Sequence, residues 1–164
     1  MTRRLVEWDT IELRVDGEGI DALVQPFVVE PIERIRLHFT NGLMRVEGSI
    51  RKFFSVPFTA EVREIRAEKT TVRVPLGDVR AAGIRIPQFL FGIFQDKLPR
   101  DLVRYEEPAT LVLSLDRFLP TFVDADVQRI WIIEGGLAVT LGKGGADLPP
   151  PTTGGPQNGN ADHA

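Results

Sequence analysis

The feature that most restricts how this chain can fold is a long run of alternating apolar and polar residues at 32–76. Successive side chains of a β-strand point to opposite faces of a sheet, so a period of two indicates strands with one apolar and one solvated face. Asn41-Gly42 interrupts the run, and this pair accepts the positive φ angles of a tight hairpin turn. A charged turn at 66–69 interrupts it again. The pattern predicts an antiparallel meander.

Further strands are predicted on both sides of this run. A first strand at 6–15 has an irregularity at Asp9-Thr10, where the alternation slips. A later strand at 110–115 is followed by a long alternating segment at 123–141, which reverses at Gly135-Gly136. The chain should therefore be rich in antiparallel β-structure.

Two helices are expected. Asp16 can cap a short helix that presents Ile20, Leu23, Val24 and Phe27 on one face. The segment IPQFLFGIFQDKLP at 86–99 predicts a longer helix at 87–98, because proline is tolerated in a first helical turn and Pro99 disfavours continuation. Its apolar stripe is Leu90, Ile93, Phe94 and Leu98. Phe89 and Phe91 lie outside the stripe, so they must face a second wall, a partner or a lipid.

The resulting fold class is α+β: one long, curved antiparallel sheet that wraps one long and one short α-helix. Gly48 and Ala60 interrupt the apolar row of the meander and would let the sheet bend. Residues 3–142 form a single domain in this interpretation. Residues 143–164 are dominated by glycine, proline and small polar residues, which predicts a disordered tail.

Composition excludes several classes of function. The 20 basic and 23 acidic residues are well mixed and give a net charge of −3, so no nucleic-acid interface is indicated. The chain has no cysteine, which excludes disulfides, thiol nucleophiles and cysteine-bound metals. No stretch approaches the length of a transmembrane helix, and no signal peptide is recognisable. The expected location is the cytoplasm by default, or the periplasm or cell envelope if a leader has been removed.

The residues for catalysis are scarce. His38 lies among outward-facing arginines on a strand, and His163 lies in the tail. Paired carboxylates occur at Glu106-Glu107 and at Asp124 and Asp126, but these positions are expected on turns or on a solvated strand face. The segment TLGKGG lacks the spacing of a phosphate-binding loop. We therefore expect no enzyme, no cofactor and no metal. A hydrolase that uses His38 is the weakest alternative.

The order of these elements resembles a known family. The helix GIDALVQPF, the hairpin in IRLHFTNGLMRVEGSI, the helix IPQFLFGIFQDKLP and the closing DADVQRIWIIEGGLAVTLG are similar to the tubular lipid-binding superfamily, whose fold is that of bactericidal/permeability-increasing protein. More specifically, these elements are similar to those of bacterial lipid-binding proteins of the cell envelope that carry a single such module. The resemblance covers about residues 5–142. It implies a curved sheet that holds lipid against a helix.

The function implied is non-enzymatic binding of a lipid or other long apolar ligand, for transfer or sequestration, between helix and sheet. The ligand-facing positions implied are Leu23, Phe27, Val46, Phe58, Val62, Val74, Leu90, Ile93, Phe94, Leu98, Leu113 and Trp131. Phe89 and Phe91 are added from the helix pattern. Peripheral contact with a membrane is a second expectation, because Arg34, Arg36, Arg45 and Arg51 form a basic row on the solvated face. Cross-strand ion pairs with glutamates are the simpler interpretation of that row.

The main alternative is a protein-interaction or oligomerisation module. In that case the helix at 87–98 and a free sheet edge would bind a partner or form a homodimer.

Overall fold

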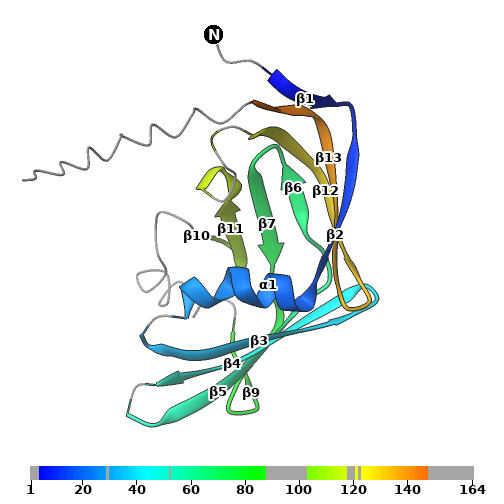
Figure 1. Ribbon diagram of the computed structural model, residues 1–164. Helices are drawn as coiled ribbons and strands as arrows, with labels where there is room; N and C mark the ends of the chain where they lie inside the picture. Colours follow the sequence, from blue (N-terminus) through cyan, green and yellow to red (C-terminus); the bar gives the residue numbers. More distant parts are fainter. Residues whose placement is uncertain are drawn as a thin grey trace, which may run out of the picture.

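The computed structural model describes residues 4–28, 30–51, 53–87, 103–117, 121 and 123–147. This part of the chain is mostly β, with 70% in strands, 10% helical and one α-helix. The strands form three separate antiparallel sheets (Figure 1). The expected fold of one sheet that wraps a long and a short helix is therefore wrong. The segment of the expected long helix, 87–98, lies outside the described residues except for Pro87, which is not helical.

The large sheet contains most of the predicted meander. Its five strands pair in the order β3-β4-β5-β8-β9. The β3–β4 hairpin turns at Asn41-Gly42, as the sequence predicts, and Gly42 has a φ of 79°. The bounds are β3 Ile32–Thr40, β4 Leu43–Arg51, β5 Ser55–Val62, β8 Gly77–Ala81 and β9 Ile84–Arg85.

A second sheet, here called the central sheet, has the order β10-β11-β7-β6. Its strands are β6 Arg66–Glu68, β7 Thr71–Pro75, β10 Val103–Glu106 and β11 Thr110–Ser114, and a 3-10 turn at Leu115–Arg117 follows. This sheet explains the error in the predicted fold. Alternation shows that β7 has one apolar face, but it does not identify the neighbouring strand. The chain leaves the large sheet after Val62, and β7 pairs with β11 instead.

The third sheet joins the two ends of the described chain and is called the terminal sheet. The long strand β13 pairs with β12 along one edge and with β1 and β2 along the other. The predicted irregularity at Asp9-Thr10 is confirmed, because it separates β1 from β2. The bounds are β1 Arg4–Trp8, β2 Ile11–Asp16, β12 Val123–Ile133 and β13 Gly136–Asp147.

β13 extends past the expected domain end at residue 142. Residues 144–147 pair with β1, so the glycine-rich stretch is a strand and not a linker. Trp8 donates a hydrogen bond from Nε1 to the Gly142 carbonyl at 3.0 Å, and its ring lies against Gly144. Glycines here make room for side chains of the neighbouring strand. Composition alone therefore indicated the wrong structure for 143–147.

The helix α1, Gly17–Val24, lies against strands of two of the sheets and contributes to the core that all three enclose (Figure 1). Asp16 caps it by accepting a hydrogen bond from the Gly19 amide at 2.8 Å, as predicted. A 3-10 turn, η1, continues it over Gln25–Phe27. Ile20 of α1 joins one core cluster with residues of every sheet: Phe39, Met44, Val62, Val72, Val74 and Ile132.

Backbone hydrogen bonds connect the sheets to one another. The Val127 amide of β12 donates to the Lys69 carbonyl at 2.9 Å, which joins the terminal and central sheets. At the β3–β4 turn, the Gly42 amide donates to the Ile132 carbonyl at 3.3 Å, which joins the large and terminal sheets. The three sheets thus form three walls around one interior.

Gly48 allows a close approach inside the large sheet. It lies directly opposite Phe58 on β5. A Cβ at position 48 would meet the Phe58 ring and the Arg34 carbonyl oxygen. The ring of Phe58 therefore lies across the bare backbone of β4, as expected for glycine in a strand interior.

Replacement of Gly48 by alanine should lower the free energy of unfolding by about 1–3 kcal/mol, because a Cβ would overpack this site. Urea unfolding followed by circular dichroism measures the change. Gly77→Ala is the matched control, since a Cβ there would meet the Glu61 carbonyl at 3.5 Å, an ordinary contact. Equal losses for the two variants would contradict the proposed role of Gly48.

Candidate apolar binding site

The inner face of the large sheet is apolar along its whole length. In register, Leu37 lies opposite Val46, Gly48 opposite Phe58, and Ile50 opposite Val56. Burial falls along this row. Phe39, Met44 and Val62, at the end near the β3–β4 turn, are buried. Farther along, Ala60 is also buried, but the larger side chains Leu37, Val46, Phe58, Ile50 and Val56 are only half-buried.

The central sheet presents a matching apolar face. Val74 lies opposite Leu111 and Val72 opposite Leu113. The two valines are buried in the core cluster, while the two leucines are half-buried and pack against it. Leu115, at the start of the following 3-10 turn, is also half-buried and packs against the cluster.

These half-buried side chains form the candidate site. Leu37 and Val46 come from the large sheet, and Ile130 and Leu137 come from the terminal sheet. Together with Leu111 and Leu113 of the central sheet, and Leu115 of the 3-10 turn that follows it, they are called the apolar lining. All pack against the core cluster, and all retain exposed surface. Among the described residues, the largest side chain with under 2% exposure is only a valine, Val62.

This distribution is unusual for a core enclosed by three sheets. Leucine and isoleucine are among the residues most often fully buried, and protein interiors are usually close-packed. Here the described leucines around the core keep part of their surface accessible. The interior can therefore offer apolar contact to a molecule that is not part of its own core.

The structure brings some of the predicted ligand-facing residues together. Val62 and Val74 are in the core cluster, and Val46 and Leu113 belong to the apolar lining. Phe58 lies on the same inner face, over Gly48. The sequence did not single out Leu37, Leu111, Leu115, Ile130 or Leu137, although the alternation placed most of them on apolar strand faces.

Other predicted positions lie elsewhere. Leu23 of α1 is 55% exposed, in contrast to buried Ile20. Trp131 lies between Ile130 and Ile132, which face the core, so its side chain is on the opposite face of the terminal sheet. For Phe27 the structure describes the backbone but not the side chain. The remaining positions lie outside the described residues: Phe89, Leu90, Phe91, Ile93, Phe94 and Leu98.

Trp131 instead contacts a cation. The guanidinium carbon of Arg129 lies 4.9 Å from the centroid of its ring, within the range of a cation–π interaction. The resemblance to the tubular lipid-binding superfamily had implied that Trp131 faces a ligand, but the structure places this side chain on the face away from the apolar lining.

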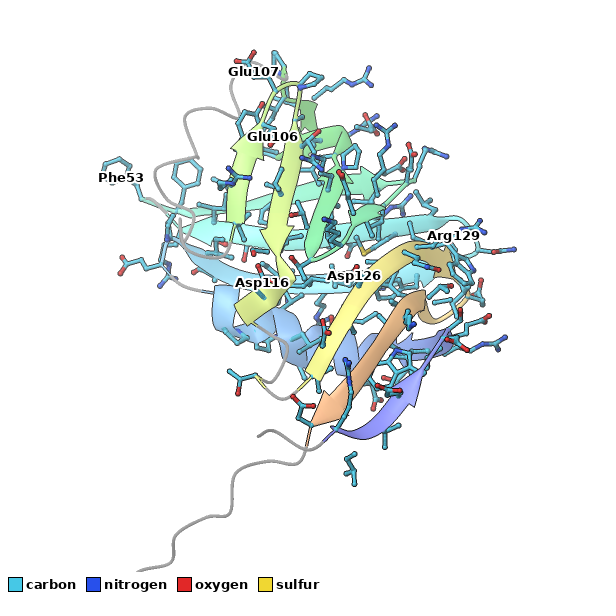
Figure 2. The ribbon with its side chains drawn as sticks, turned by 90° about the horizontal axis from the view of Figure 1, so that it is seen from above. Phe53, Glu106, Glu107, Asp116, Asp126 and Arg129 are labelled. Atoms are coloured by element: carbon cyan, nitrogen blue, oxygen red, sulfur yellow. The ribbon has the colours of Figure 1, made fainter. Side chains whose placement is uncertain are left out.

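The carboxylates of Glu106 and Glu107 do not meet that of Asp126 (Figure 2). Glu106 and Glu107 lie at the end of β10, far from Asp126 on β12 in this view, and Glu106 pairs with Arg73 at 3.4 Å. His38 is on the solvated face, 3.3 Å from the Glu47 carboxylate. No group of three or more potential metal-ligating side chains occurs among the described residues.

Ion pairs cover the outer face of the large sheet. Arg45 pairs with Glu61 at 3.5 Å, and Arg51 pairs with Glu33 at 2.8 Å. These are the cross-strand pairs that the sequence indicated for the basic row. The outer face of the large sheet is therefore solvated, and its apolar surface is on the inner face.

Comparisons with family models, with curated proteins and with solved structures find no match for this chain. The described residues form a mostly β structure of three antiparallel sheets, in which several inward apolar side chains are only half-buried. None of the described helices has the length and apolar character needed to cross a bilayer. The resemblance to the tubular lipid-binding superfamily stays a prediction.

The Glu33 carboxyl offers a test of the outer-face geometry. Its pKa is lowered from the ordinary value of 4.5, first because the Ser55 hydroxyl donates a hydrogen bond to it, and also because Arg51 is close. A carboxyl with a lowered pKa in the folded state stabilises the fold above the unfolded-state pKa. That contribution is lost as pH falls through the lowered folded-state pKa.

Ser55→Ala should raise the pKa of Glu33 toward 4.5, as measured by NMR titration of the side-chain carboxyl carbon. Ser49→Ala is the matched control and should raise it less, because the Ser49 hydrogen bond is a smaller cause. A pKa of 4.5 or above for Glu33 in the native protein would contradict the hydrogen bond from Ser55.

Proposed function

We propose that this domain binds a lipid or another long apolar molecule on its apolar lining, by burial alone and without catalysing a reaction. The observation that carries the proposal is the set of half-buried side chains, mostly leucines together with Val46 and Ile130, that pack around one small core from three sheets. Each face is apolar over several successive inward positions, which suits an extended hydrocarbon chain better than a compact polar ligand.

The energetics are sufficient for such a ligand. Burial of apolar surface contributes about 25 cal/mol per Å², so covering a few of these side chains supplies several kcal/mol. No specific polar contact is required. The orientation of the polar end of the ligand would then depend on the rim of the site.

The double variant Leu37→Ala, Leu111→Ala should weaken binding of a fluorescent fatty acid by about tenfold or more, because it removes apolar contact from two walls. Fluorescence titration measures affinity, and thermal unfolding confirms that the variant is folded. Trp131→Ala, on the opposite face of the terminal sheet, is the matched control and should leave affinity within about twofold.

Native mass spectrometry of the purified protein, with organic extraction of co-purifying molecules, tests the same proposal without a chosen ligand. A clean ligand-free mass, together with no binding of the fluorescent fatty acid, would overturn it.

A second candidate is an interaction module, and one observation favours it. β1 and β2 line an edge of the terminal sheet that no other described strand covers. Leu5, Val6 and Leu13 are exposed there. Strand addition by a second copy would cover this edge. A concentration-dependent dimer that Leu5→Ser, Val6→Ser dissolves would support this candidate.

A further inference from the structure

The β4–β5 turn exposes two adjacent aromatic side chains. Phe53 is 91% and Phe54 72% exposed. Figure 2 shows Phe53 projecting away from the ribbon. Exposed phenylalanine is costly for a protein surrounded only by water, and adjacent exposed apolar side chains mark interaction sites more often than isolated ones do.

The exposure does not arise from a frayed strand end. The Glu33 carboxylate bonds to both residues that flank the turn: it accepts a hydrogen bond from the Ser55 hydroxyl at 2.6 Å and pairs with Arg51 Nε at 2.8 Å. The Arg51 amide also donates to the Pro31 carbonyl at 2.7 Å. Both strands at the base of the turn, β4 through Arg51 and β5 through Ser55, are therefore tied to the start of β3.

A second turn lies at the same end of the large sheet. Ala81 pairs with Phe58, and the Ala82 amide donates to the Pro57 carbonyl at 2.8 Å. The β8–β9 turn is thus beside the first residues of β5. Ile84, the first residue after this turn, is 74% exposed. The three most exposed of the described large apolar side chains therefore occupy one end of one sheet.

Basic residues flank both turns. Arg51 and Lys52 directly precede Phe53, and Arg85 directly follows Ile84. The side chains of Arg51 and Arg85 are 71% and 75% exposed. Each has a carboxylate partner, Glu33 or Asp78, that leaves most of its surface accessible. Apolar tips with adjacent cations match the layered chemistry of a bilayer surface, in which anionic headgroups overlie hydrocarbon.

We propose that Phe53, Phe54 and Ile84 form a docking tip that inserts into the surface of an anionic lipid bilayer, with Arg51 and Arg85 at the level of the headgroups. Two protruding turns suit a fluid plane, which can close around each of them, better than a rigid protein surface, which would need a matching hollow for each. The tip is at the opposite end of the large sheet from the β3–β4 turn, which contacts the terminal sheet (Figure 1).

The tip also adjoins the proposed site. Ile50 and Val56 pair at the base of the β4–β5 turn, and Gly48 and Phe58 follow on the same face. Apolar residues thus continue from the tip to Val46 of the apolar lining. A docked domain would present its interior to the hydrocarbon of the membrane. This last step rests on the proposed function, whereas the docking itself does not.

Flotation with vesicles tests the docking. The native protein should float with vesicles of phosphatidylcholine mixed with phosphatidylglycerol, less with phosphatidylcholine alone, and less at high salt. Phe53→Ser, Phe54→Ser should reduce binding to the mixed vesicles by about tenfold or more, because binding scales with inserted apolar area. Trp131→Ala is the matched control, because it removes an aromatic side chain from the face of the terminal sheet opposite the core, and it should bind like the native protein.

Three outcomes would overturn the proposal: no binding of native protein to the mixed vesicles, equal binding by the tip variant, or an equal loss in the Trp131→Ala control. A dimer that disappears in the tip variant, without vesicle binding, would assign Phe53 and Phe54 to a second copy of the chain instead. The tip variant should still bind fluorescent fatty acid in detergent-free solution. Vesicle flotation therefore tests the docking, and fatty-acid titration tests binding in the interior, so either proposal can be overturned without the other.

Discussion

Burial of three one-sided sheets against each other is the constraint on which the rest of this structure depends. No single sheet can cover its own apolar face, and α1 is too short to cover any of them. The sheets therefore meet around Ile20 and Val62, where each contributes at least one buried side chain to one cluster. Because the walls are longer than this shared core, apolar residues continue beyond it on the inner faces. The proposed binding site is a direct result of that mismatch.

The local features of the fold could be predicted from the sequence because they depend on neighbouring residues. Asn41-Gly42 determines a hairpin turn, and Asp16 determines where α1 begins. The slip at Asp9-Thr10 marks the boundary of β1 and β2. In each case the chemistry of one or two residues decides the backbone conformation, whatever the distant parts of the chain do.

The partition into three sheets could not be predicted in the same way. The alternation in β7 is equally compatible with pairing to β5 or to β11, since both neighbours present apolar residues to the same face. The face of Trp131 was ambiguous because its neighbours on both sides are isoleucines. The strand at 143–147 was missed because glycine usually weakens strands, whereas here it accommodates Trp8. These outcomes depend on contacts between residues far apart in the sequence.

The pairing of β1 with the last residues of β13 has a consequence for how the protein is made. Arg4 is opposite Asp147, so the first strand finds its partner only after nearly all of the described chain has been synthesised. Until then the exposed edge and the apolar side chains of β1 and β2 have no neighbour in the terminal sheet. Such non-local pairing is a slow step in folding, and unpaired edges favour aggregation while it is pending. The nascent chain therefore depends most on protection during the interval before the ribosome releases β13.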